Sequence, residues 1–376
     1  MLDIPRALNP LDIALAATRM YSTLPVVGKH LEPFAGLTAM ALYGGHYAPA
    51  ALKAAISRRA GTGAEVQVPV EAPGEDVEVE DIHGSLVPPF VRFRAQKRRY
   101  LHRGSVRYGD HPSQLLDVWR RPDLPPNAPV LLFVPGGAWV QGTRVLQGHT
   151  LLAHLVRKGW VCLTMDYRVS PVHRWPRHVA DVNAAIAWAR ANVDRFGGDR
   201  DFVAIAGCSA GGHLATLAAL TPGDERFRGE LTDDADTSVD AVVGIYGRYD
   251  WEDRSTASRR SFQGFLEHVV VGRKQSRHPE VFEAASPMAR IHADAPPTLL
   301  IHGEHDAIIP VQEARDFHAA LGAVSRNPVR YCEVPRAGHA FDLVDTSHAR
   351  RCATEVSKFL TSVRASHAER DAVVAS

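Results

Sequence analysis

From about residue 104 onward, short apolar runs alternate with helical stretches along the chain. The runs cover residues 115–119, 130–134, 160–165, 202–206, 241–246, 298–301 and 329–334. Most of them are continuous rather than alternating, which is typical of strands covered on both faces. Because helices separate most of these strands, the pattern predicts right-handed crossovers and an α/β fold with a mainly parallel central sheet flanked by helices.

The remaining segments predict the domain organisation. Helical periodicity is clearest over residues 178–196, 213–220, 311–321 and 347–363. Residues 1–84 read as an alanine-rich helical preface that ends in an acidic linker, and residues 85–366 as one α/β domain. Within that domain, residues 248–291 lack strong runs and predict an excursion over the sheet edge. Residues 367–376 predict a disordered tail.

Composition excludes several classes of protein. The apolar share of 45% and the charged share of 23% are close to globular averages. Lysine and arginine number 43 against 42 acidic residues, so the net charge does not favour nucleic acid as a partner. The four cysteines are widely spaced and predict buried free thiols, with neither a metal site nor a cofactor.

The amino terminus has acidic residues and prolines where a secretory signal would have a basic start. We therefore expect no cleavable export signal and a cytoplasmic location. The stretch from 34 to 56 is interrupted by glycines and a proline, so it fails as a transmembrane helix, although the preface helices could contact a membrane peripherally. Oligomeric state is left open.

A basic run occupies residues 92–107, with two tyrosines among its arginines. It could form a patch that binds anions or nucleic acid. The simpler interpretation, which the balanced overall charge favours, is a solvated strand pair that faces the acidic linker.

The motif with the most chemical content lies directly after the 202–206 run. The sequence Gly207-Cys208-Ser209-Ala210-Gly211 fits G-x-S-x-G between a strand and a helix, which is the expected context of a nucleophilic serine. Glycines on both sides allow the strand and the helix to approach closely around a strained turn. A small-residue turn also occurs in dinucleotide sites, but the glycine spacing fits neither G-x-G-x-x-G nor a P-loop.

A serine nucleophile needs a base that is held by an acid. In this kind of site the partners follow the nucleophile along the chain in the order serine, acid, histidine. Asp306 follows the 298–301 run, and His339 follows the 329–334 run. We predict that His339 is the general base and Asp306 the orienting acid, with Glu304 as a rival acid.

The oxyanion requires backbone N–H donors from the residue after the nucleophile and from the loop after an earlier strand. Ala210 is the first candidate, and Gly136 and Gly137 after the 130–134 run are the others. Trp139 and Tyr246 are candidate substrate-binding aromatics, and each has the alternative of an ordinary core position.

Taken together, these residues resemble the bacterial branch of the hormone-sensitive-lipase family of esterases over roughly residues 104–363. The matching pieces are LDVWRRP (116–122), PGGAW (135–139), DYRVSP (166–171), GCSAGGHLA (207–215), HGEHDAIIP (302–310) and AGHAF (337–341). The resemblance implies an α/β-hydrolase fold in which the preface and the excursion form a helical cap. Two positions depart from the family pattern, because Pro135 replaces the usual histidine and Cys208 the usual acidic residue.

The predicted function is a carboxylesterase or lipase that cleaves small-molecule carboxylic esters through an acyl-enzyme intermediate. Two alternatives stay open. The acid loop also resembles that of prolyl-oligopeptidase-type peptidases and the nucleophile turn that of aryl-formamidases, which would make the substrate an amide. A non-catalytic binding module on a hydrolase scaffold would keep the fold, but such chains typically lose a triad member.

Overall fold

The computed structural model describes residues 89–145, 147–343 and 346–374. The predicted helical preface and linker, residues 1–84, lie outside these ranges. Within the described ranges, no helix is both long and apolar enough to cross a bilayer.

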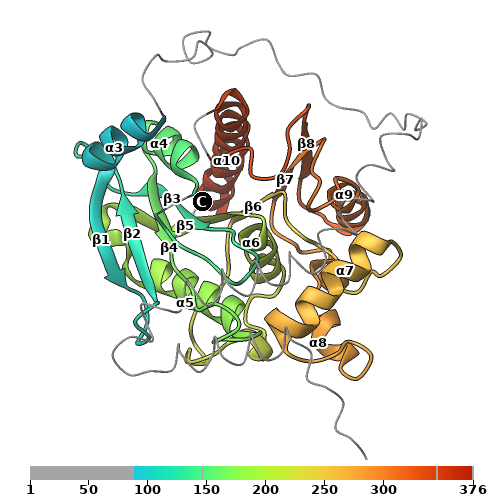
Figure 1. Ribbon diagram of the computed structural model, residues 1–376. Helices are drawn as coiled ribbons and strands as arrows, with labels where there is room; N and C mark the ends of the chain where they lie inside the picture. Colours follow the sequence, from blue (N-terminus) through green and yellow to red (C-terminus); the bar gives the residue numbers. More distant parts are fainter. Residues whose placement is uncertain (1–88, 146, 344–345, 375–376) are drawn as a thin grey trace, which may run out of the picture.

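An eight-stranded sheet in the order β1-β2-β4-β3-β5-β6-β7-β8 forms the centre of the molecule (Figure 1). Its strands are β1 (Leu101–Arg107), β2 (Leu115–Trp119), β3 (Ala128–Val134), β4 (Val161–Met165), β5 (Gly198–Cys208), β6 (Ala241–Ile245), β7 (Thr298–Gly303) and β8 (Val329–Val334). The edge strand β1 pairs antiparallel with β2, β2 pairs antiparallel with β4, and every other pairing is parallel. This confirms the mainly parallel sheet predicted from the apolar runs.

Helices cover both faces of the sheet. Figure 1 shows α3 (Pro89–Tyr100), α4 (His149–Arg157) and α10 (Ser347–Val374) on one side, and α5 (Arg177–Asn192) and α6 (Ala210–Leu220) on the other. The side chains of β3 alternate accordingly: Leu131 and Phe133 pack into the core beneath α4 and α10, whereas Leu132 packs into the core beneath α5 and α6. Burial on both faces explains why the strand sequences are continuously apolar.

A third, smaller core lies where α9 (Gln312–Val324) packs beside β7 and β8. Three short 3₁₀ helices also lie in the described ranges: η2 (Val193–Phe196), η3 (Glu225–Phe227) and η5 (Pro287–Arg290).

The excursion predicted over residues 248–291 is helical. It contains α7 (Ala257–Phe265), which continues as a π-helical segment (Leu266–Val271), and α8 (Pro279–Ala284). The carbonyl of Val270 accepts hydrogen bonds from the N–H of Trp175 at 3.1 Å and from Ser170 Oγ at 3.2 Å. These bonds fix the excursion to the loop that precedes α5.

Two sequence predictions differ from the structure. The basic run is not a strand pair, because its first part forms α3 and only Leu101–Arg107 forms the edge strand β1. The carboxyl terminus is not a disordered tail from residue 367, because α10 continues to Val374. Alanine, glutamate and arginine are strong helix formers, and they extend the helix beyond its last core contacts.

Candidate active site

Ser209 occupies the turn between β5 and α6. Its backbone has φ 54° and ψ −121°, a left-handed conformation that side-chain-bearing residues rarely adopt. A Cβ on Gly207 would lie 2.2 Å from the carbonyl oxygen of Gly211, and a Cβ on Gly211 would lie 2.1 Å from that of Val134. The glycines are therefore required by close backbone contacts, and the turn presents Ser209 beyond the carboxyl end of the sheet.

The structure brings Ser209, His339 and Asp306 together from three separate loops. Ser209 Oγ lies 2.9 Å from His339 Nε2, and His339 Nδ1 lies 2.7 Å from Asp306 Oδ2. His339 and Asp306 follow β8 and β7, as the chain order predicts. Because both ring nitrogens of His339 have partners, the imidazole can accept a proton from the serine on one side while the carboxylate holds the proton on the other.

Asp306 is held in its ionised form. Its Oδ1 accepts the N–H groups of Ile308 and Ile309, both at 2.9 Å, and His302 Nε2 lies 3.2 Å from Oδ2. Burial alone would raise the pKa of this carboxyl, but the hydrogen bonds from His302 and His339 hold it well below its ordinary value. His302 is a residue to which sequence reasoning gave no role, although it opens the HGEHD segment.

The rival acid Glu304 lies elsewhere. Its Oε2 accepts the backbone N–H of Arg336 at 2.8 Å, and its side chain is partly exposed beside His305. Glu304 therefore ties the loop that carries His339 to the loop after β7, and it does not contact the imidazole of His339.

The loop after β3 differs from the prediction at Gly136. Its N–H donates to Gln147 Oε1 at 2.6 Å, so this donor faces another part of the protein and is not directed at a substrate. The next two N–H groups, those of Gly137 and Ala138, have no hydrogen-bond partner among the described residues. The N–H of Ala210, at the first position of α6, lacks an intrahelical acceptor. These three N–H groups are candidate donors.

The predicted substrate-binding aromatics Trp139 and Tyr246 are both almost fully buried. Trp139 Nε1 donates to His213 Nδ1 at 3.2 Å, and the Tyr246 hydroxyl donates to Asp342. The ring of Tyr246 packs edge-on against the imidazole of His339, with 4.8 Å between centroids. Their polar atoms are thus engaged within the protein, and the ring of Tyr246 borders that of His339.

Two buried histidines brace the loop after β3 at Trp139, which itself has a positive φ of 58°. His213 Nε2 donates to the carbonyl of Ala285 at 2.7 Å, and His178 Nε2 lies 3.1 Å from the carbonyl of Trp139. Burial lowers the pKa of each to about 3. Both are therefore neutral near pH 7, which suits His213 Nδ1 to accept the indole N–H.

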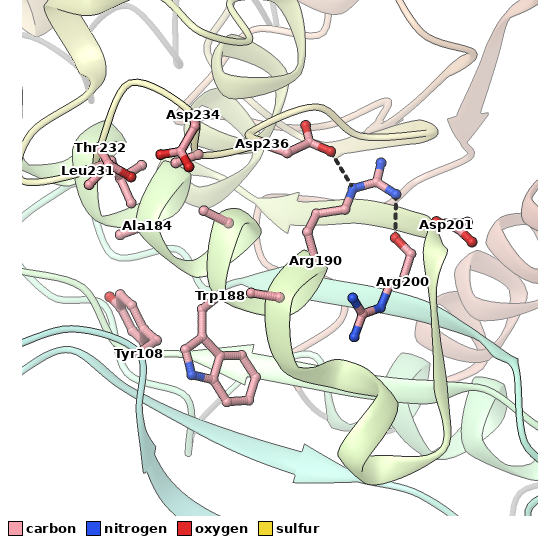
Figure 2. Close-up of a pocket in the computed structure, with 13 residues that line it drawn as sticks. Tyr108, Ala184, Trp188, Arg190, Arg200, Asp201, Leu231, Thr232, Asp234 and Asp236 are labelled. Atoms are coloured by element: carbon pink, nitrogen blue, oxygen red, sulfur yellow. Dashed lines mark hydrogen bonds and ion pairs between the residues drawn. The ribbon is translucent and has the colours of Figure 1, made fainter.

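A separate hollow of about 580 Å³ lies between α5 and the loop around residues 231–236 (Figure 2). Its lining includes Arg200 and Asp201 near the amino end of β5, whereas Ser209 follows the carboxyl end of the same strand. Arg190 in this hollow is paired with Asp236. The hollow is therefore distinct from the site around Ser209. Within the described part of the chain, no group of histidine, cysteine and acidic side chains is arranged to hold a metal ion.

The sheet order, the helical layers and the turn at Ser209 define an α/β-hydrolase fold. A family model named BD-FAE matches residues 116–321, more than half of the chain, and the chain belongs to this family. It is 52% identical over 376 residues to esterase LipC of Mycobacterium tuberculosis, an alignment that covers 96% of this chain and 93% of that protein. The activity that follows is that of a carboxylic ester hydrolase.

Other similar proteins are also esterases. Esterase LipQ of Mycobacterium tuberculosis is 42% identical over 291 residues, which cover 76% of this chain and 68% of that protein. Among solved structures, esterase 2 of Thermogutta terrifontis phosphonylated by sarin has a similar fold, with a TM-score of 0.58 and 22% identity over 69% of this chain and 94% of that one.

Proposed function

We propose that this esterase is a serine hydrolase in which Ser209 is the nucleophile, His339 the general base and Asp306 the orienting acid. Ser209 Oγ attacks the ester carbonyl as His339 takes its proton, and the imidazolium then protonates the departing alcohol. Water enters, His339 deprotonates it, and attack on the acyl-serine releases the acid and restores Ser209. No cofactor takes part in this sequence.

The observation that carries the proposal is the unbroken contact from Ser209 Oγ through His339 to Asp306, with distances of 2.9 and 2.7 Å. The ionised state of Asp306 supports it, since a carboxylate keeps the proton of the neutral imidazole on Nδ1 and stabilises the imidazolium that forms. The Thermogutta terrifontis esterase of similar fold is phosphonylated by sarin, a reaction typical of serine hydrolases.

For the oxyanion we propose Gly137, Ala138 and Ala210 as donors. In the loop after β3, the N–H groups of Gly137 and Ala138 have no hydrogen-bond partner among the described residues, and Ala210 adds the free amino end of α6. Preorganised donors of this kind stabilise the tetrahedral intermediate more than the ground-state ester. Gly136 is left out of the set because its N–H is already bonded.

Three finer assignments belong to this proposal. The quoted motifs support membership of the hormone-sensitive-lipase branch. The helical segment from 248 to 291, together with the amino-terminal residues, would form a cap that excludes water from the acyl-enzyme. Trp139 and Tyr246 would bound the acyl pocket by their rings.

The test compares Ser209→Ala with Ser362→Ala, which makes the same change on the exposed side of α10. We expect Ser209→Ala to lower hydrolysis of p-nitrophenyl butyrate by about three orders of magnitude or more, since triad members act as a unit. It should also abolish labelling by a fluorophosphonate, while circular dichroism and Ser362→Ala match the wild type. Retention of a tenth or more of the activity would remove Ser209 from the mechanism.

A further inference from the structure

One side-chain oxygen joins the oxyanion loop to the strand that carries the nucleophile. Gln147 Oε1 accepts the N–H of Gly136 at 2.6 Å and the thiol of Cys208 at 2.9 Å. Gly136 follows β3, and Cys208 ends β5 directly before Ser209. Since both partners are donors, the amide of Gln147 must direct its oxygen and not its nitrogen toward them.

The backbone that follows Gln147 is fixed by close packing. The next residue, Gly148, has φ 73°, and a Cβ there would lie 2.6 Å from the ring of Phe133. The carbonyl of Gly148 also accepts the N–H of Leu152 at the start of α4. The half-buried side chain of Gln147 therefore extends from an anchored point to the loop, and its position is defined by the packing of α4.

The contact holds two backbones at short range. A Cβ on Gly136 would lie 2.6 Å from the carbonyl oxygen of Cys208 and 3.0 Å from Ser209 Cβ. At such distances, rotation of the peptide that precedes Gly136 would change the direction of the following N–H groups relative to Ser209. Pro135, the residue before, has no N–H with which to fix the loop.

We propose that Gln147 is a positioning residue, which orients the Gly136 peptide so that the next two N–H groups point at the oxyanion. The inference rests on the proposed role of Ser209 and adds a residue to it. Gln147 does not contact the reacting atoms, so its contribution is to the geometry of the donors.

The identity of residue 208 fits this arrangement. Burial raises the pKa of the Cys208 thiol well above its ordinary value, so the group stays protonated and can donate to Gln147 Oε1. An acidic residue at this position, as in the resembled family, would present an acceptor to the same oxygen when ionised. The amide oxygen of Gln147 and the thiol of Cys208 therefore form a matched acceptor and donor.

The test uses Gln147→Met, which keeps the length of the side chain and removes the strong acceptor. Loss of a whole oxyanion donor costs about 100- to 1,000-fold in turnover, so misorientation of donors that remain present should cost about tenfold to a hundredfold in kcat. KM for p-nitrophenyl butyrate and the melting temperature should stay near the wild-type values. The rate of fluorophosphonate labelling should fall with kcat, because phosphonylation uses the same donors.

Two further variants complete the experiment. Gln147→Glu retains an acceptor oxygen and should recover part of the lost kcat, and Gln312→Met applies the same change to an exposed glutamine of α9 and should leave kcat unaltered. A kcat for Gln147→Met within twofold of the wild type overturns the inference, as does an equal loss in the methionine and glutamate variants. Ser209→Ala in parallel keeps the two proposals apart: an inactive Ser209→Ala with a normal Gln147→Met rejects the role of Gln147 alone.

Discussion

The two buried histidines at Trp139 predict how stability depends on pH. His213 stacks on the ring of Trp251 at 4.6 Å and accepts the Trp139 indole N–H on Nδ1, so a proton on Nδ1 would remove an acceptor. His178 is equally buried, and burial lowers the pKa of both to about 3. In the unfolded chain each imidazole returns to its ordinary pKa of about 6.5.

The sign follows from proton binding. Below about pH 6.5 the unfolded state takes up protons that the native state refuses, so the free energy of unfolding falls as the pH falls. The stabilisation is complete above that pH and is lost progressively toward the folded pKa of about 3. Between pH 7 and 5 the linkage relation gives a loss of about 2 kcal/mol for each histidine.

Urea unfolding at pH 7, 6 and 5 measures this effect, with His213→Gln as the perturbation. The variant should be less stable than the wild type at pH 7, because it loses the stacking on Trp251. It should nevertheless lose about 2 kcal/mol less between pH 7 and 5, since one titrating group has been removed. His278→Gln alters a partly exposed ring and should follow the wild-type curve. Equal losses in the wild type and in His213→Gln would refute the reasoning.

Three further outcomes are expected. Asp306→Asn should lower turnover by about a thousandfold or more by releasing the tautomer of the base, whereas Glu304→Gln should lose far less; steady-state kinetics giving the reverse order would move the acid to Glu304. Glu313→Gln should lower the free energy of unfolding, measured by urea denaturation, by about 3–5 kcal/mol, because its fully buried partner Arg248 is left without a counter-charge. A loss below about 1 kcal/mol would contradict this. Pro135→His should not raise kcat on a short ester, because the loop it begins is already braced; a clear increase would show a deficit there.

The sheet, and the meeting of the three site residues at one of its edges, could be predicted from the sequence for physical reasons. Continuous apolar runs mark strands buried on both faces, and the carboxyl ends of parallel strands share one edge of the sheet. Residues after β5, β7 and β8 therefore had to meet, and Ser209, Asp306 and His339 do.

The residues that hold these side chains in place could not be predicted from the sequence. Gln147 is 61 residues from Cys208, and His213 is 74 residues from Trp139. No periodicity or motif links such pairs, because their contact depends on how α4 and α6 pack on the sheet. The direction of the Gly136 N–H was missed for the same reason. The helix α3 was missed because its arginines suggested a solvated strand pair, although arginine and lysine favour helices.

The left-handed backbone at Ser209 has a consequence for how this chain can change. Ala138, Trp139, Tyr246 and Ala340 also have positive φ, between 39° and 58°, and all lie in the loops that build the site. Each such residue costs about 1–3 kcal/mol, and glycine would relieve most of that cost. Variants selected only for heat resistance would therefore tend to acquire glycine at these positions and lose the rigidity of the loops around Ser209. Thermostability and catalytic rate are opposed at the same few peptide units of this esterase.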